Sequence, residues 1–259
     1  MIQLLVLLSG LALSPAAGVH AQATGAARST LDPLPRDLEI QLALSALPPH
    51  LRAGATVYLL NPAKGFEVAR QGTNGFSALV ARTGDDTFFG AWPLTKYPED
   101  ILYPIGFDQA GAGAQLRVFL DAAELQAKGT PPAELKRMIQ QRHQSGYYKA
   151  PERAGISYML APVLRTYFQP ESSDSVLTIS FPHVMYFAPG VSARDIGAGP
   201  LAGVYPFVIL EGHHGYMIQA LGVTERAVIR KEYEGMLASL CRLKAAWCLP
   251  DATKGGTKP

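Results

Sequence analysis

The sequence is low in charged residues. Asp, Glu, Lys and Arg make up 17% of the 259 residues, against 48% hydrophobic residues, and the formal net charge is +2. Lys and Arg are scattered, so the chain lacks the basic stripe of a nucleic-acid-binding protein and the polybasic cluster that attracts anionic lipid. We therefore expect no nucleic-acid partner. The apolar content suffices for one sizeable core, and the low charge argues against a disordered chain.

Several catalytic and metal-binding motifs are also missing. The sequence contains neither HExxH nor CxxC. Residues 155–159 (GISYM) lack the final glycine of the GxSxG nucleophile motif. Residues 111–113 (GAG) lack the third glycine of a dinucleotide-binding loop, and we expect no strand before them. A serine hydrolase and a dinucleotide-binding protein are therefore not indicated.

The amino-terminus has the pattern of a signal peptide. Residues 4–13 are an apolar run, and Ala21-Gln22-Ala23 matches the A-x-A cleavage pattern. The run is too short for a permanent membrane span, so we expect no membrane insertion after cleavage. We divide the chain into a signal peptide (1–23), a single domain (24–250) and a flexible tail (251–259). The pattern predicts an exported protein, either periplasmic or secreted.

The two cysteines, Cys241 and Cys248, are a candidate disulfide, because exported proteins meet an oxidising compartment. Residues seven apart in one unbroken helix are separated by about 10 Å along its axis, which is beyond the reach of a disulfide. A bridge therefore requires the helix to end before Cys248, and Pro250 makes an early end plausible. The alternative is two separate thiols that face the core.

Hydrophobic periodicity predicts the secondary structure. The sequence predicts strands at 55–60, 66–70, 76–82, 156–160, 207–210 and 216–221, and helices at 121–128, 131–145 and 224–244. A further strand begins at Val176, and Pro182 interrupts it, so that 181–187 is either an edge strand or a bulged continuation. Residues 37–47 alternate like a strand, but their composition favours a helix. We expect an α+β fold, a mostly antiparallel sheet with packed helices in a single domain.

Three local expectations accompany this assignment. The Asn74-Gly75 pair is a strong hairpin signal, so the first three strands are expected to form a meander. The aromatic-rich stretch 83–115 is expected to wrap the sheet without regular structure. Asp121 is read as a helix-capping residue, and His143 as a solvated histidine on the polar side of its helix.

A histidine-rich hairpin is the candidate polar site. Glu211, His213 and His214 lie between two predicted strands, and His183 lies on a neighbouring one. Residues two apart on a strand face the same side, so Glu211 and His213 are expected to converge. Two imidazoles, a carboxylate and a water are a known catalytic zinc pattern, which also suits other divalent ions. The alternative is that these side chains cap backbone groups or sit in solvent.

Aromatic residues suggest a second kind of site. Trp92, Tyr186 and Tyr216 are candidates to line an apolar pocket for a small-molecule ligand. The same rings are also suited to plain core packing. Two functions therefore remain open, a protein that binds a small molecule or metal ion, and a metal-dependent hydrolase that uses His183, Glu211 and His213. The residues do not decide whether the protein is an enzyme.

Four sets of segments form a distinctive series along the chain, namely ATVYLL with GTNGF, ELQAKGTPPAEL with YKAPERAGISYMLAP, FPHVMYFAPG, and the PFVILEGHHGYMI hairpin. Together they resemble an uncharacterised family of exported bacterial proteins of unknown function. They span roughly residues 37–222, and the carboxy-terminal helix with its cysteines is not part of the pattern. The resemblance implies export and a bacterial source, and it supplies no activity and no catalytic residues.

Overall fold

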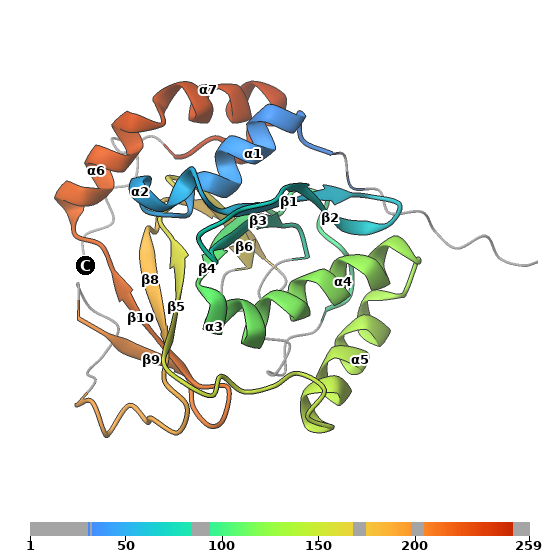
Figure 1. Ribbon diagram of the computed structural model, residues 1–259. Helices are drawn as coiled ribbons and strands as arrows, with labels where there is room; N and C mark the ends of the chain where they lie inside the picture. Colours follow the sequence, from blue (N-terminus) through green and yellow to red (C-terminus); the bar gives the residue numbers. More distant parts are fainter. Residues whose placement is uncertain (1–30, 32, 84–93, 168–174, 198–204, 251–259) are drawn as a thin grey trace, which may run out of the picture.

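An eight-stranded, almost entirely antiparallel sheet organises the fold (Figure 1). The computed structural model describes residues 31, 33–83, 94–167, 175–197 and 205–250. The strand order is β2-β1-β3-β4-β5-β8-β10-β9, and β6 and β7 form a separate two-stranded sheet. The strands are β1 (Thr56–Asn61), β2 (Gly65–Arg70), β3 (Ser77–Ala81), β4 (Tyr103–Phe107), β5 (Gly155–Met159), β6 (Leu164–Tyr167), β7 (Val176–Ile179), β8 (His183–Phe187), β9 (Phe207–Leu210) and β10 (Tyr216–Ala220).

Helices cover both faces of the large sheet (Figure 1). One face carries helices from both ends of the chain, namely α1 (Arg36–Ser45), α2 (Pro49–Arg52), α6 (Val223–Glu232) and α7 (Glu234–Leu243). The other face carries a group that is continuous in sequence, namely α3 (Gln109–Gly111), the π-helical turn η1 (Ala112–Leu116), α4 (Arg117–Ala127) and α5 (Pro132–Gln144). The predicted α+β class, with helices packed on a mostly antiparallel sheet, is confirmed.

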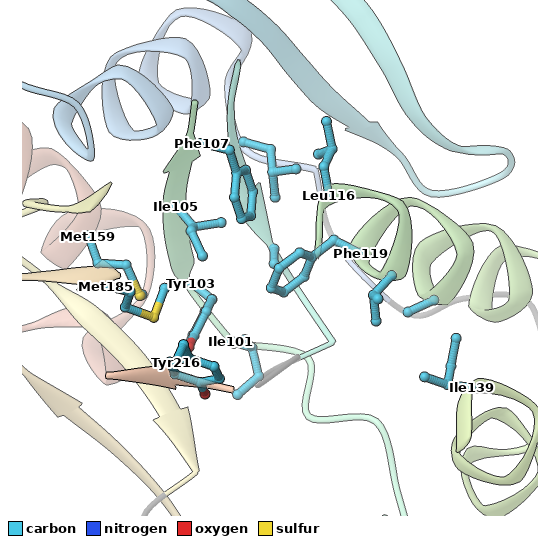
Figure 2. Packing of buried hydrophobic residues seen from close by; sticks show 14 of the residues in the cluster. Ile101, Tyr103, Ile105, Phe107, Leu116, Phe119, Ile139, Met159, Met185 and Tyr216 are labelled. Atoms are coloured by element: carbon cyan, nitrogen blue, oxygen red, sulfur yellow. The ribbon is translucent and has the colours of Figure 1, made fainter. Parts of the chain in front are cut away.

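The sheet separates two hydrophobic cores. In β3, Leu79 packs toward α4 and α5, while Ala78 and Val80 pack toward α1 and α7. This follows from the alternation of side chains across a strand. Figure 2 shows the first core, in which Phe107 and Phe119 lie with ring centroids 6.0 Å apart. Both faces of the central strands are buried, so the helices on each side depend on the same sheet.

The expected amino-terminal meander is wrong at its third strand. β1 and β2 form the predicted hairpin, but β3 pairs with β1 in parallel, from Thr56 opposite Ser77. The chain crosses the end of β1 to reach its other side, and a Cβ on Gly72 would lie 2.3 Å from the backbone nitrogen of Thr56. Only glycine allows this close crossing. The turn at Asn74-Gly75 therefore belongs to a crossing and not to a hairpin.

The expectation of no regular structure across 83–115 is also wrong. β4 lies within this stretch, fully buried at the centre of the sheet, and α3 and η1 follow it. Pro104 argues against a central strand because it cannot donate a ladder hydrogen bond. The pairing of β4 with β5 begins only at Gly106, so the proline lies outside that ladder.

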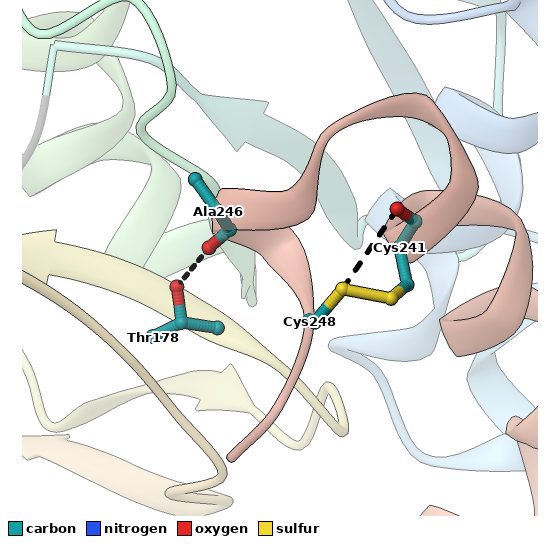
Figure 3. The surroundings of a disulfide bond; sticks show 4 residues. All are labelled: Thr178, Cys241, Ala246 and Cys248. Carbon is teal, nitrogen blue, oxygen red and sulfur yellow. Dashed lines mark hydrogen bonds between the residues drawn. A yellow bond between two sulfur atoms is a disulfide. The ribbon is translucent and has the colours of Figure 1, made fainter.

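The carboxy-terminal helix differs from its prediction by a bend. α6 and α7 are separated at Tyr233, where φ is −106°. α7 ends at Leu243, and a short 3-10 helix, η2 (Ala245–Trp247), turns the chain back. Cys241 and Cys248 form a disulfide with a Cα–Cα distance of 4.5 Å (Figure 3). Of the two alternatives for the cysteines, the disulfide is the one present, and its condition, a helix that ends before Cys248, is met.

Contacts with distant strands and loops fix the segment after α7. The hydroxyl of Thr178 on β7 donates to the carbonyl oxygen of Ala246 (Figure 3). The indole of Trp247 donates to the carbonyl oxygen of Asp100 at 2.7 Å. The predicted signal peptide and tail lie outside the described residues. No helix within the described ranges is long and apolar enough to cross a membrane.

Candidate functional site

The predicted β9–β10 hairpin is present, and its tip presents its polar side chains in different directions. Gly212 has a φ of +92°, a left-handed conformation that suits glycine. Glu211 and His213 are exposed, whereas His214 is half-buried. The Oε1 of Glu211 accepts a hydrogen bond from the backbone nitrogen of Ala193 at 3.0 Å. Glu211 therefore fastens a neighbouring loop, in agreement with the capping alternative.

His183 is far from this tip. It pairs with Ala220, four residues along β10 from Tyr216, where the tip begins. At about 3.3 Å per residue, this separation is about 13 Å, which is too long for a shared metal ion. The expectation that His183, Glu211 and His213 form one metal site is wrong. Among the residues that the structure describes, no group of three or more His, Cys, Asp or Glu side chains is arranged to hold a metal ion.

His183, on β8, has the surroundings of a buried residue with a structural role. His183 is 3% exposed, and its ring lies 4.7 Å from the ring of Phe181. Its Nδ1 lies 2.7 Å from the carbonyl oxygen of Phe181. Because a carbonyl oxygen only accepts, Nδ1 carries the proton and donates. Burial lowers the pKa of His183 to about 4, although the bond to Phe181 opposes this shift.

Two of the rings named for the predicted aromatic pocket, Tyr186 and Tyr216, do not line a common pocket. Tyr186 and Tyr216 belong to paired strands, and Tyr216 lies opposite Phe187. Neighbouring residues on a strand point to opposite faces, so Tyr186 and Tyr216 lie on different faces of the sheet. Tyr186 is 36% exposed and Tyr216 is 3% exposed. Trp92 lies outside the described residues.

A different histidine meets the hairpin. His143, in the last turn of α5, lies with its ring centroid 5.0 Å from that of His214, nearly perpendicular at 82°. The other side of His143 packs on Tyr148, with centroids 4.6 Å apart. The expectation of a solvated His143 is therefore wrong. The ring is half-buried because α5 rests on α4 and turns this side chain toward the sheet.

Both imidazoles are biased toward the neutral state. Burial, together with a smaller effect of the nearby His214, lowers the pKa of His143 to about 4. Burial also lowers the pKa of His214, with a contribution from His213. Near pH 7 the pair therefore offers two neutral rings, each with one N–H donor and one acceptor nitrogen. Such groups can hold a hydroxyl, accept a proton or bind a metal ion.

A buried carboxylate orients the residues beside His143. Asp121 is 1% exposed in the interior of α4, so the expectation of a capping role is wrong. Its Oδ1 lies 2.6 Å from the Nε of Arg117. Its Oδ2 accepts from the guanidinium of Arg142 and from the hydroxyl of Tyr148, the latter at 3.0 Å. Asp121 thus holds in place Arg142, which precedes His143 in the chain, and Tyr148, whose ring packs on His143.

The two imidazoles close a small enclosed space, which we call the imidazole pocket. Its volume is about 10 Å³, enough for about one water-sized group. The π-helical turn, α4, α5, the segment before β5, the strands β8 and β9 and the hairpin tip contribute its lining residues. These residues are Ala114, Gln115, Val118, His143, Pro151, Phe187, Leu210 and His214. Single π-helical turns inside helices occur frequently at functional sites, and this one supplies the Gln115 amide.

An open depression lies next to the imidazole pocket, and we call it the entry cleft. Its volume is about 470 Å³, and it shares Ala114 and Pro151 with the imidazole pocket. Gly113 lines the cleft, and a Cβ added to it would meet no atom within 4 Å, so the space beside this glycine is open. The mouth carries two cationic side chains and one anionic one, Lys149, Arg153 and Glu152. The cleft has the size of a small-ligand site.

One sequence signal points to His143. The ring lies four residues after Ile139 and eight after Leu135, both buried, and this spacing keeps all three on one side of the helix. The buried stripe of α5 therefore predicts an inward His143. Gln115 has no comparable signal, because the π-helical turn that directs it inward has no distinct sequence pattern.

Comparison of the chain with protein-family models, with curated proteins and with solved structures gives no match. The geometry of the imidazole pocket and the entry cleft is therefore the basis for assigning a function.

Proposed function

We propose that the protein is an exported bacterial protein that binds a small molecule in the entry cleft, with one polar group of that molecule held between His143 and His214. The observation that carries this proposal is the pairing of two half-buried imidazoles from separate elements in a small pocket that shares Ala114 and Pro151 with the adjoining cleft. Buried polar groups with shifted pKa values beside a cleft are typical of binding and catalytic sites. The disulfide supports the export part of the proposal.

The surroundings indicate the chemistry of the ligand. Neutral imidazoles both donate and accept, which suits a hydroxyl group. The mouth of the cleft, with Lys149 and Arg153 against Glu152, is net positive and favours a carboxylate. A small hydroxylated carboxylic acid meets both requirements, with the hydroxyl inside and the carboxylate at the mouth.

Histidine NMR tests this function. We expect gluconate or lactate, added to protein labelled at the imidazole carbons, to shift the signals of His143 and His214 and to leave that of exposed His50 unchanged. Gly113→Trp is expected to abolish the shifts by filling the cleft, whereas Gly113→Ala is expected to retain them. Signals that stay fixed at millimolar ligand, or shifts that persist in Gly113→Trp, would contradict the proposal.

A second candidate function is divalent metal binding. Two imidazoles that bind one tetrahedral ion at about 2 Å have ring centroids about 5 Å apart, and the observed separation is 5.0 Å. His143 and His214 would hold the ion, which would act as a Lewis acid toward a bound molecule. Calorimetry with Zn²⁺ tests this, since His214→Ala is expected to abolish binding and His50→Ala to preserve it. The hydrolase based on His183, Glu211 and His213 is not retained, because those side chains do not meet.

The export part has its own test. Expression of the full chain in a bacterium, followed by fractionation and amino-terminal sequencing, is expected to give periplasmic or secreted protein that begins at Thr24. Protein that remains in the cytoplasm with residues 1–23 attached would contradict it.

A further inference from the structure

A larger cavity lies on the opposite side of the sheet from the imidazole pocket, along α6 and α7. We call it the α6–α7 groove. Its volume is about 620 Å³, and its lining residues are Ala227, Arg230, Lys231, Glu234, Leu237, Ala238, Cys241, Cys248 and Leu249. The first seven follow helical spacing, so they form one continuous stripe over both helices. The last two belong to the segment that returns beside α7.

The disulfide makes one wall of this groove. It joins Cys248 to Cys241 (Figure 3), with a Cα–Cα distance of 4.5 Å. The next residue, Leu249, therefore lies beside the α7 residues that line the groove. The bonds of Thr178 to Ala246 and of Trp247 to Asp100 fix the same segment to the rest of the protein. The wall is therefore present before any ligand arrives, which reduces the ordering cost of binding.

Charge is confined to one end of the groove. Arg230, Lys231 and Glu234 lie around the bend between the helices, whereas Leu237, Ala238 and Leu249 line the rest. Neither Arg230 nor Lys231 forms an ion pair with another described residue. The charged end is net positive, and the remainder is apolar. A ligand that matches this pattern has an anionic head and an apolar tail.

We propose that the α6–α7 groove binds a monoanionic amphiphile, such as a medium-chain fatty acid. The carboxylate lies at Arg230 and Lys231, and the chain lies over Leu237 and Ala238 against the disulfide wall. The volume falls within the range of small-ligand pockets, about 300 to 1,000 Å³. This site is separate from the entry cleft, and neither proposal depends on the other.

Calorimetry with laurate, below the concentration at which it forms micelles, tests the proposal. Ala238 is exposed and lines the groove, so Ala238→Glu is expected to weaken laurate binding at least tenfold without disturbing the core. Val228 is 62% exposed on the same pair of helices and does not line the groove, so Val228→Glu is the matched control and is expected to bind as the parent protein does. Equal affinity in all three proteins would overturn the assignment.

Two further measurements test separately the role of the two cationic side chains and the identity of the molecule that occupies the groove. Arg230→Glu with Lys231→Glu is expected to weaken laurate binding at least tenfold and to leave the binding of uncharged dodecanol unchanged. Equal loss for both ligands would overturn the role assigned to the two cations. Light scattering in the absence of ligand is expected to give a monomer. A dimer that Ala238→Glu dissociates would make a second copy of this chain the occupant and would overturn the amphiphile.

Discussion

Acid is expected to destabilise the protein through His183. The folded pKa of His183 is lowered to about 4 by burial, below the value of about 6.5 in an unfolded chain. As the pH falls, the unfolded state therefore binds the proton first, and the stabilisation, complete above about pH 6.5, is lost toward pH 4. At about 1.4 kcal/mol per pKa unit, the loss from His183 alone is about 2 kcal/mol between pH 8 and pH 5, and about 3 kcal/mol when complete.

Urea unfolding followed by circular dichroism at pH 8 and pH 5 measures this loss. His183→Asn removes the titrating ring and keeps an N–H donor for the carbonyl oxygen of Phe181, so its stability is expected to fall by about 2 kcal/mol less than that of the parent protein. His50 is exposed, and His50→Asn is expected to behave as the parent does. Contributions from His143 and His214 are common to all three proteins and cancel. An equal fall in the parent and in His183→Asn would refute the reasoning.

The remaining predictions concern stability and are measured by urea unfolding. Asp121→Asn is expected to cost about 2 kcal/mol, because the buried carboxylate loses its charge-assisted bonds to the partly exposed Arg142 and the exposed Arg117; a cost below 1 kcal/mol would contradict a stabilising role for this carboxylate. Reduction of the Cys241–Cys248 disulfide, which closes a short loop, is expected to cost about 2 kcal/mol, and Cys241→Ser with Cys248→Ser should then be insensitive to reductant. Glu39→Ala is expected to cost about 1–3 kcal/mol, since the carboxylate accepts from the buried backbone nitrogen of Leu60; Glu39→Gln, which keeps an acceptor, should cost less.

The local sequence pattern predicts the helices and strands of this fold well, but it predicts poorly which of them lie side by side. The helix expected at 131–145 is α5, and the predicted β9–β10 hairpin is present. In contrast, the parallel pairing of β1 with β3 depends on how Gly72 crosses β1, and a turn signal such as Asn-Gly does not contain that information. β4 is missed for a related reason, because Pro104 is acceptable only where the neighbouring ladder stops short.

In the candidate site, too, the local sequence predicts some features and tertiary packing decides others. His214 belongs to the predicted cluster of polar residues at the hairpin tip. Its inward position is not predicted, because the alternation of side chains along a strand favours His213 as the partner of Glu211. Its partner His143 comes from α5, and only the packing of that helix on α4 brings the two rings together. His183 looks equivalent to them in sequence, yet strand register carries it to the other end of β10. Residue types predict candidates, and tertiary packing selects among them.

The placement of α7 against α1 has a consequence for the order in which the chain can fold. α1 is the first described α-helix and α7 the last, and they meet in one core through residues such as Leu42 and Leu240. Until the final segment has emerged from the ribosome or the translocation channel, the apolar side of α1 has no cover. A chain that stops short of α7 therefore presents exposed hydrophobic surface, the kind that chaperones and proteases recognise. The core that α1 and α7 share can therefore form only after the polypeptide has been synthesised through α7.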